Sequence, residues 1–254
     1  MNRLDAETRN RFSMLWKKYF GDTEFPIAIF YSDEALAGSK ASESEERCVI
    51  GMLSSVRAGE TLSLSANSQM CGGAMRYLGF TAEMPMKDFD YFLSTGIPGR
   101  LRGERYKKSP EIVRESMKHS PSFEAPGPFL NFVPWSKLSD ADKPQVVVFF
   151  GNQDVISGLF TLANFDEVDP DAVICPFGSG CSQIVYHPYL ELRSPRPRCV
   201  IGMFDISARP YLGENMLSFA VPIMKFERMV DNMEASFLST DTWERLFDRL
   251  QKPD

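Results

Sequence analysis

Residues 146–162 read VVVFFGNQDVISGLFTL, and this stretch decides the fold class. The opening VVVFF is apolar and rich in β-forming residues, which is typical of a buried strand. Asp154 stands where a helix cap is expected, and the apolar residues after it recur at helical spacing at Val155, Ile156, Leu159 and Leu162. A buried strand that passes directly into an amphipathic helix indicates an α/β protein.

The same order of elements occurs earlier in the chain. IAIFY (27–31) predicts a strand, VIGMLSSV (49–56) a helix, TLSLSA (61–66) a strand and MCGGAMRYL (70–78) the start of another helix. The later copy continues through DAVICPF (171–177) to GSGCSQIVY (178–186). Two βαβ-like units predict a mixed sheet with flanking helices, in a single compact domain over residues 1–254. They also suggest an internal duplication, with halves at about 20–125 and 126–240.

The hexapeptide RCVIGM occurs twice, at 47–52 and at 198–203. The first copy lies within a helical pattern, whereas the second follows Pro195 and Pro197 and lies in a β-like run. Tertiary context overrides weak local preference, so we expect one helix, one strand and a coincidental repeat. Further helices are predicted at 5–20, 109–119, 225–237 and 241–251, and further strands at 128–138 and 217–222.

Composition excludes several classes of protein. The 254 residues carry a net charge of −6, which argues against a general nucleic-acid-binding protein. No apolar run approaches the roughly 20 residues needed to span a bilayer, so no membrane association is expected. The opening MNRLDAETRNRF lacks the plan of a secretion signal, and we therefore expect a cytoplasmic protein whose five cysteines are reduced.

Cys71, Gly72 and Gly73 form the first candidate site. A thiol at the start of a helix is close to unpaired N–H groups, which favour its ionised form, and glycines let a ligand approach the backbone closely. The alternative is a tight strand-to-helix turn with a small packed cysteine. Both interpretations stay open.

The second candidate site is the turn formed by Gly178, Ser179, Gly180, Cys181 and Ser182. Backbone amides at a glycine-rich helix start suit a carboxylate or phosphate. The alternative is an ordinary N-capping turn in which Ser179 or Ser182 is the cap. If the two halves are related, both turns would face one shared cavity that holds a small anionic ligand or cofactor.

A metal or iron–sulfur site at Cys48, Cys71 and Cys181 is a further hypothesis. Their spacings of 23 and 110 residues match no compact metal motif, so this hypothesis depends on the number of thiols alone. His187 lies near Cys181 in sequence, and we expect a structural histidine, with a catalytic Cys/His pair as the alternative. Arg100, Arg102 and Arg105 form a basic cluster that could attract an anion, but a solvated face is the expected role.

The chain resembles the DUF169 family of uncharacterised bacterial and archaeal proteins. The likeness extends from about residue 8 to residue 237 and is carried by PIAIFYSD, ERCVIGMLSSVRAGETLSLSANSQMCGGAMRYLGF, PQVVVFFGNQDVISGLF and GSGCSQIVYHPY. The resemblance implies recurrent cysteines at Cys48, Cys71 and Cys181, and it implies no particular activity. FDISAR (204–209) departs from the glycine-aspartate-arginine of the family at Asp205 and Arg209.

Three functional hypotheses follow from these residues. The first is a protein that binds a small anionic ligand or cofactor around Cys71 and Cys181. The second is a thiol- or metal-dependent enzyme, and the third is a structural or partner-binding protein. Familiar enzyme motifs are missing from the sequence, among them Walker A, GxGxxG, HExxH and GxSxG. The sequence leaves open the ligand, the cofactor and whether the chain forms a homo-oligomer.

Overall fold

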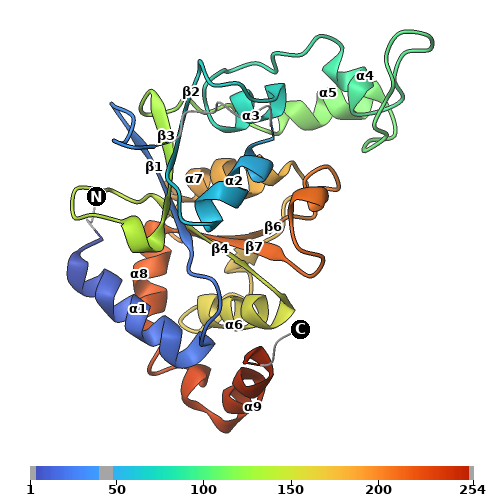
Figure 1. Ribbon diagram of the computed structural model, residues 1–254. Helices are drawn as coiled ribbons and strands as arrows, with labels where there is room; N and C mark the ends of the chain where they lie inside the picture. The colour runs from blue at the N-terminus through green and yellow to red at the C-terminus, as the bar shows by residue number, and fades with distance from the viewer. Residues whose placement is uncertain (1–3, 40–47, 252–254) are drawn as a thin grey trace.

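A mixed β-sheet lies between two layers of helices (Figure 1). The computed structural model describes residues 4–39 and 48–251. Within them, seven strands pair in the order β2-β3-β1-β4-β7-β6-β5, and β5–β6 is the parallel pair among antiparallel ones. The strands are β1 (Ile27–Ser32), β2 (Leu62–Ser65), β3 (Phe129–Pro134), β4 (Val146–Gly151), β5 (Val173–Ile174), β6 (Cys199–Gly202) and β7 (Leu217–Pro222). The α/β class is therefore confirmed.

Helices of different lengths cover both faces of the sheet. They are α1 (Ala6–Phe20), α2 (Val49–Arg57), α3 (Gly72–Tyr77), α4 (Phe89–Phe92), α5 (Pro110–Lys118), α6 (Gln153–Asn164), α7 (His187–Glu191), α8 (Ile223–Asn232) and α9 (Asp241–Leu250). A π-helical segment, η2 (Ser182–Tyr186), leads directly into α7. Short 3₁₀ turns occur at η1 (Trp135–Lys137), η3 (Arg209–Tyr211) and η4 (Phe237–Ser239).

Strand β4 is central and is buried along its whole length. Alternate side chains point to opposite faces, so Val146 and Val148 pack with α2 while Val147 and Phe149 pack with α1 and α6. A strand buried on both faces reads as a continuous apolar run, which is why VVVFF shows no alternation. The strand and helix predicted from the opening stretch are thus confirmed, but the predicted cap is wrong. Asn152 is the N-cap residue of α6, because its Oδ1 accepts the N–H groups of Asp154 and Val155. Asp154 lies in the first turn and pairs with Arg249 instead.

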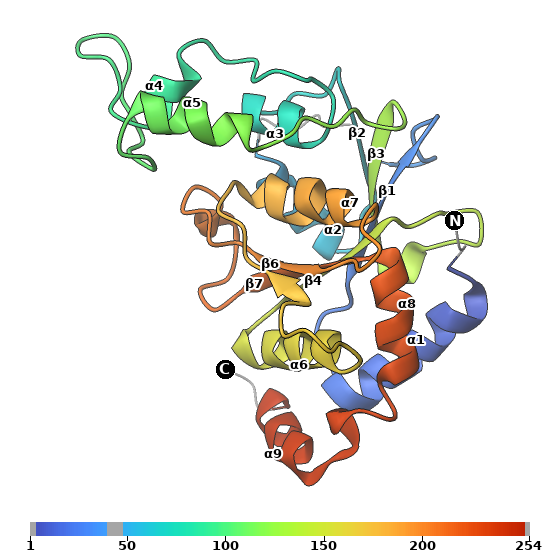
Figure 2. The same cartoon turned by 180° about the vertical axis from the view of Figure 1, so that it is seen from behind.

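Each face of the sheet has its own core. One contains α2, α7 and the inward side chains of α3, whereas the other contains α1, α6, α8 and α9 (Figures 1 and 2). The second core is strongly aromatic: Trp16 stacks on Phe20 with ring centroids 4.1 Å apart, and Phe12 lies edge-on to Trp135 at 4.7 Å. Such aromatic pairs add packing energy beyond the burial of their area.

The internal duplication remains a prediction that the topology does not favour. Strands β1 and β4 are antiparallel neighbours, so a twofold axis relating them would be normal to the sheet and would leave equivalent helices on one face. Helix α2 and its proposed equivalent α6 lie instead on opposite faces (Figure 1). The repeated RCVIGM behaves as expected, because Val49–Met52 is helical in α2 and Cys199–Gly202 is strand β6.

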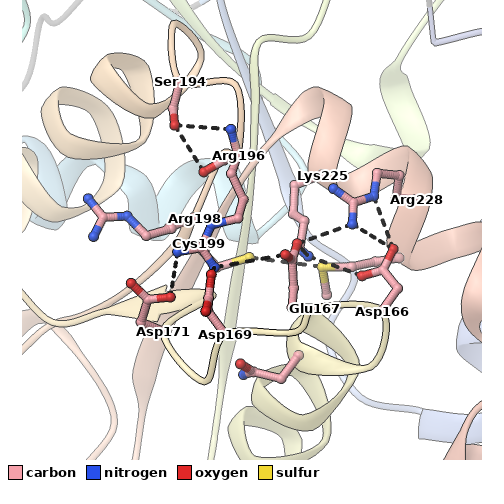
Figure 3. A network of polar contacts seen from close by, with 12 residues as sticks. Asp166, Glu167, Asp169, Asp171, Ser194, Arg196, Arg198, Cys199, Lys225 and Arg228 are labelled. Atoms are coloured by element: carbon pink, nitrogen blue, oxygen red, sulfur yellow. Dashed lines mark hydrogen bonds and ion pairs between the residues drawn. The ribbon is translucent and has the colours of Figure 1, made fainter.

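A buried ion-pair network fastens α8 to the loop after α6, and nothing in the sequence pattern predicts it (Figure 3). The Lys225 side chain is 0% exposed, and its Nζ lies 2.5 Å from Glu167 Oε1 and 3.3 Å from Asp166 Oδ1. Arg228 pairs with the same two carboxylates. Burial opposes ionisation of Asp166, but the hydrogen bond from Arg228 and the charge of Lys225 outweigh it and lower the pKa of this carboxyl.

Replacing Lys225 with methionine should destabilise the fold. Removing one partner of a buried pair leaves the Glu167 carboxylate poorly compensated, so we expect K225M to lower the free energy of unfolding by about 2–4 kcal/mol in urea denaturation. The double variant K225M/E167Q removes both charges and should recover part of this loss. A K225M variant as stable as the parent would show that Arg228 alone neutralises the carboxylates.

Candidate functional site

Three cysteines that are distant in sequence lie in the same neighbourhood on one side of the sheet. Cys48 is the N-cap residue of α2, Cys71 is the N-cap residue of α3, and Cys181 lies in the first turn of the helical run that includes η2 and α7. Burial raises the pKa of the Cys181 thiol well above its ordinary value, and Cys71, Cys48 and Asp205 lie near enough to raise it further. We call Cys48, Cys71, Cys181 and Asp205 the cysteine corner.

The start of the Gly180–Glu191 helical run is already occupied by a carboxylate of the chain itself. The Gly180 N–H donates to Asp205 Oδ2 at 2.9 Å, and the Ser182 N–H donates to Ser179 Oγ at 3.4 Å. Asp205 Oδ1 accepts two further hydrogen bonds from Ser207. The amides that the sequence assigned to an anionic ligand thus have internal partners, and Asp205 adds a negative charge where a bound anion would lie.

Gly180 brings this helix start into direct contact with its neighbours. A Cβ at this position would lie 2.8 Å from Ile50 Cγ1 of α2 and 3.3 Å from the Ala208 Cβ. Only glycine lets the two helix starts and the loop after β6 pack this closely. The prediction that Gly180 serves close approach fits the geometry, but the group that approaches is protein.

The π-helical segment places Gln183 where it joins two loops. The Gln183 side chain is buried; its Nε2 donates to the Pro176 carbonyl at 3.1 Å, and its Oε1 accepts the Met203 N–H at 2.6 Å. Met203 has a left-handed φ of 71°. A non-glycine residue in this conformation is strained, and π-bulges and strained residues are enriched at functional sites. Gln183 thereby fixes the loop that carries Asp205.

Cys71 differs from Cys181 in its exposure and its bonding. The Cys71 side chain is exposed, and its Sγ accepts the Ala74 N–H at 3.4 Å. A Cβ on Gly72 would make only an ordinary contact with Pro85 Cγ at 3.4 Å, and one on Gly73 would lie 4.0 Å from Cys71 Sγ. This first candidate turn therefore presents an exposed thiol at the predicted helix start, and its use by a ligand stays a prediction.

Exposed apolar side chains occur next to residues of the cysteine corner in the chain. Phe177 is 71% exposed, and Phe204 and Ile206, which flank Asp205, are 54% and 71% exposed. Lys107 Nζ lies 4.3 Å above the centre of the Phe177 ring. Partial burial raises the pKa of Tyr106, and the charges of Glu104 and Asp205 raise it further. Because Asp205 acts on Tyr106, the loop before α5 lies near the cysteine corner.

The residues present do not fit the predicted metal or iron–sulfur site. Across residues 4–39 and 48–251, no three His, Cys, Asp or Glu side chains are grouped so that they could hold a metal ion. The buried Cys181 thiol also resists the ionisation that a metal ligand requires. A cluster at Cys48, Cys71 and Cys181 therefore stays a prediction without support from the geometry.

The two histidines differ in their burial and in their neighbours. The His187 ring packs edge-on against Tyr186 with centroids 4.9 Å apart, and burial lowers the pKa of His187 to about 4. A neutral, packed imidazole fits the structural histidine that the sequence favoured over a Cys/His pair. The His119 side chain is exposed, with its Nε2 3.8 Å from Glu115 Oε1.

A comparison with models of protein families shows which family the chain belongs to. The model of the DUF169 family, described as uncharacterised ArCR, matches residues 17–232. The chain belongs to the DUF169 family. The matched range includes the whole cysteine corner of this DUF169 protein. Searches of curated proteins and of solved structures gave no match. Within the described part of the chain, no helix has both the length and the apolar character needed to cross a bilayer.

Sequence reasoning missed several residues of the corner. Asp205 stood out only as a departure from the family pattern, and its role depends on a contact 25 residues away that no local motif encodes. Gln183 was expected only as part of a helix, because a five-residue π-helical segment is too short to show a period different from that of an α-helix. The one local signal was a carboxylate, Asp205, between two apolar residues, Phe204 and Ile206, in a stretch outside any predicted strand core.

Alanine at Gly180 should disrupt the corner, whereas alanine at Gly72 should not. The new Cβ of G180A would overlap Ile50, so we expect a loss of about 1–3 kcal/mol in the free energy of unfolding. G72A introduces the same methyl group into ordinary contact distance and should change stability by less than about 1 kcal/mol. Urea denaturation of both variants makes the comparison, and equal losses would contradict the close packing described for Gly180.

The half-buried His187 should make stability depend on pH. Its folded-state pKa of about 4 is below the unfolded value of 6.5, so the unfolded chain takes up a proton first and stability falls as the pH drops between these values. From pH 7 to pH 5 we expect a loss of about 1–2 kcal/mol, after allowance for partial exposure. Urea denaturation at pH 7 and pH 5 should show a smaller loss of stability in H187Q than in the parent. The same pH dependence in both proteins would contradict a contribution from His187.

Proposed function

We propose that this DUF169 protein binds a small organic molecule at the cysteine corner. The observation that carries the proposal is the convergence of Cys48, Cys71 and Cys181 from three separate elements, beside exposed apolar side chains. Thiols behave as small, polarisable apolar groups. Exposed aromatic side chains gathered around such a corner are typical of a ligand-binding surface, which is more often apolar with a few polar groups.

The electrostatics of the corner favour a hydrogen-bond donor over an anion. A carboxylate offers about four lone-pair positions, and Asp205 uses three of them on Gly180 and Ser207. The remaining position can accept a bond from a neutral or cationic ligand. A bound anion would have to displace Asp205 from the Gly180 amide. The proposed ligand therefore has an apolar body and a donor group, and this replaces the anion inferred from the glycine turns.

A thiol-dependent enzyme is the second candidate, and the exposure of Cys71 favours it. The accessible Cys71 thiol would be the attacking group, because burial keeps Cys181 protonated. With hydrogen peroxide as oxidant, Cys71 and one neighbouring thiol would lose two hydrogens and form a disulfide, while the peroxide is reduced to two waters. Cys48 and Cys181 are the two neighbours available for this step.

Titration with Nile red, a neutral apolar dye, tests the binding proposal. We expect saturable fluorescence that weakens by about tenfold or more in F177S/F204S, since burying an aromatic ring contributes about 1.5–3 kcal/mol. The matched control is F160S/F165S, in which two rings that are 43% and 45% exposed on α6 and at its C-terminal end are replaced. Native mass spectrometry of the purified protein would then identify any natural ligand.

The controls separate the candidate functions. Equal loss of dye binding in both double variants, or none in either, would overturn the binding proposal. The redox candidate requires instead that hydrogen peroxide lowers the protein mass by two hydrogens in the parent and not in C71S. Cys175, which is also exposed, supplies the matched variant C175S.

A further inference from the structure

The segment between α4 and α5 is rich in basic residues. Residues 99–108 read GRLRGERYKK, and their five basic side chains and one carboxylate give a net charge of +4 in a chain of net charge −6. This segment projects from the edge of the molecule, away from the sheet (Figures 1 and 2). We call residues 95–105 the basic loop.

The basic loop is a built structure held at both ends. The Glu104 N–H donates to the Phe92 carbonyl at 2.7 Å, and the Arg105 N–H donates to the Ser94 carbonyl at 3.0 Å. Ile97 and Leu101 pair across the tip. At the neck, Gly96 and Gly103 bring the two sides into backbone contact so closely that a Cβ on either would overlap the other side.

This loop lines a hollow that is largely open to solvent. The hollow has a volume of about 860 Å³ and is lined by Thr95 and residues 97–105. Pockets that hold small molecules usually measure about 300–1,000 Å³. Arg105 adopts a left-handed φ of 60°, a conformation that costs energy in any residue with a side chain. The neck of the loop therefore holds strain beside the hollow.

Arg102 and Arg105 differ from the other arginines of the described chain. Arg100 is paired with Asp88, 2.6 Å away, and every remaining described arginine is bonded to a carboxylate, a backbone carbonyl or a tyrosine. Arg102 and Arg105 make no such contact within residues 4–39 and 48–251. Their guanidinium groups are therefore available to an external anion, in a protein that otherwise pairs its arginines internally.

We propose that the basic loop binds a multiply charged phosphate group of a small molecule. Guanidinium groups match phosphate oxygens in a bidentate geometry. Two unpaired guanidinium groups line the hollow, with Glu104 as its one acidic residue, and they favour an anion with more than one negative charge. The negative charge on the rest of the chain would repel a long polyanion, so a small molecule fits better than a nucleic acid. This site lies outside the cysteine corner, and the inference goes beyond the proposed function.

Isothermal titration with inorganic tripolyphosphate tests the inference on the full chain. We expect R102Q/R105N to weaken binding by about tenfold or more for each guanidinium lost, because hydrogen bonds to charged groups are the stronger ones. Asparagine is chosen at position 105 because it tolerates the left-handed conformation. The matched control is K137Q/K143Q, which removes two exposed positive charges elsewhere and should leave binding unchanged.

The outcomes decide the proposal. Loss of affinity in R102Q/R105N alone, with the far-ultraviolet circular dichroism of the parent retained, supports the site. Binding should also weaken between 50 and 200 mM NaCl, since salt screens exposed charges. Equal affinity in the parent and R102Q/R105N, or no binding to the parent, would overturn it. A parallel titration with ATP compares a nucleotide with the free tripolyphosphate anion as the source of the phosphate group. Tight binding of ATP or of tripolyphosphate that is lost in R102Q/R105N would support the site.

Discussion

Burial of strand β4 on both faces is the constraint on which the rest of the structure depends. Its side chains alternate between two cores, so neither layer of helices can be removed without exposing half of a central strand. This requirement places α1, α6, α8 and α9 on one face and α2, α3 and α7 on the other (Figure 1). Cys48, Cys71 and Cys181 share a side of the molecule because they lie at the starts of helices in the layer that contains α2, α3 and α7.

Local periodicity predicted most of the elements, because apolar spacing is a property of neighbouring residues. The strands at 27–31, 146–150 and 217–222 and the helices at 5–20 and 109–119 appear close to their expected limits. The face of the sheet that each helix covers was not encoded in this way. Helices α2 and α6 have similar apolar patterns and lie on opposite faces, which is why similarity of pattern suggested a duplication that the topology does not favour.

Polar contacts between distant residues were the least predictable part of the site. Asp205 meets Gly180 across 25 residues, and Lys225 meets Glu167 across 58. Such pairs form only when the sheet brings their loops together, so no local spacing in the sequence predicts them. The RCVIGM repeat makes the same point for the backbone, since identical residues are helical in α2 and extended in β6.

Partnered and unpartnered polar groups give different information about ligands. The Gly178–Ser182 turn has the residues of an anion site, yet its leading amide already bonds Asp205, so its polarity serves the fold. Arg102 and Arg105 have only solvent, although the loop that carries them is fixed at its neck and strained at one of them. A protein that pairs nearly all of its described arginines internally gains no stability from leaving these two exposed on a strained loop. An external anion would give these two side chains partners that the fold does not supply, and this difference in bonding separates the two candidate anion sites more sharply than either sequence motif does.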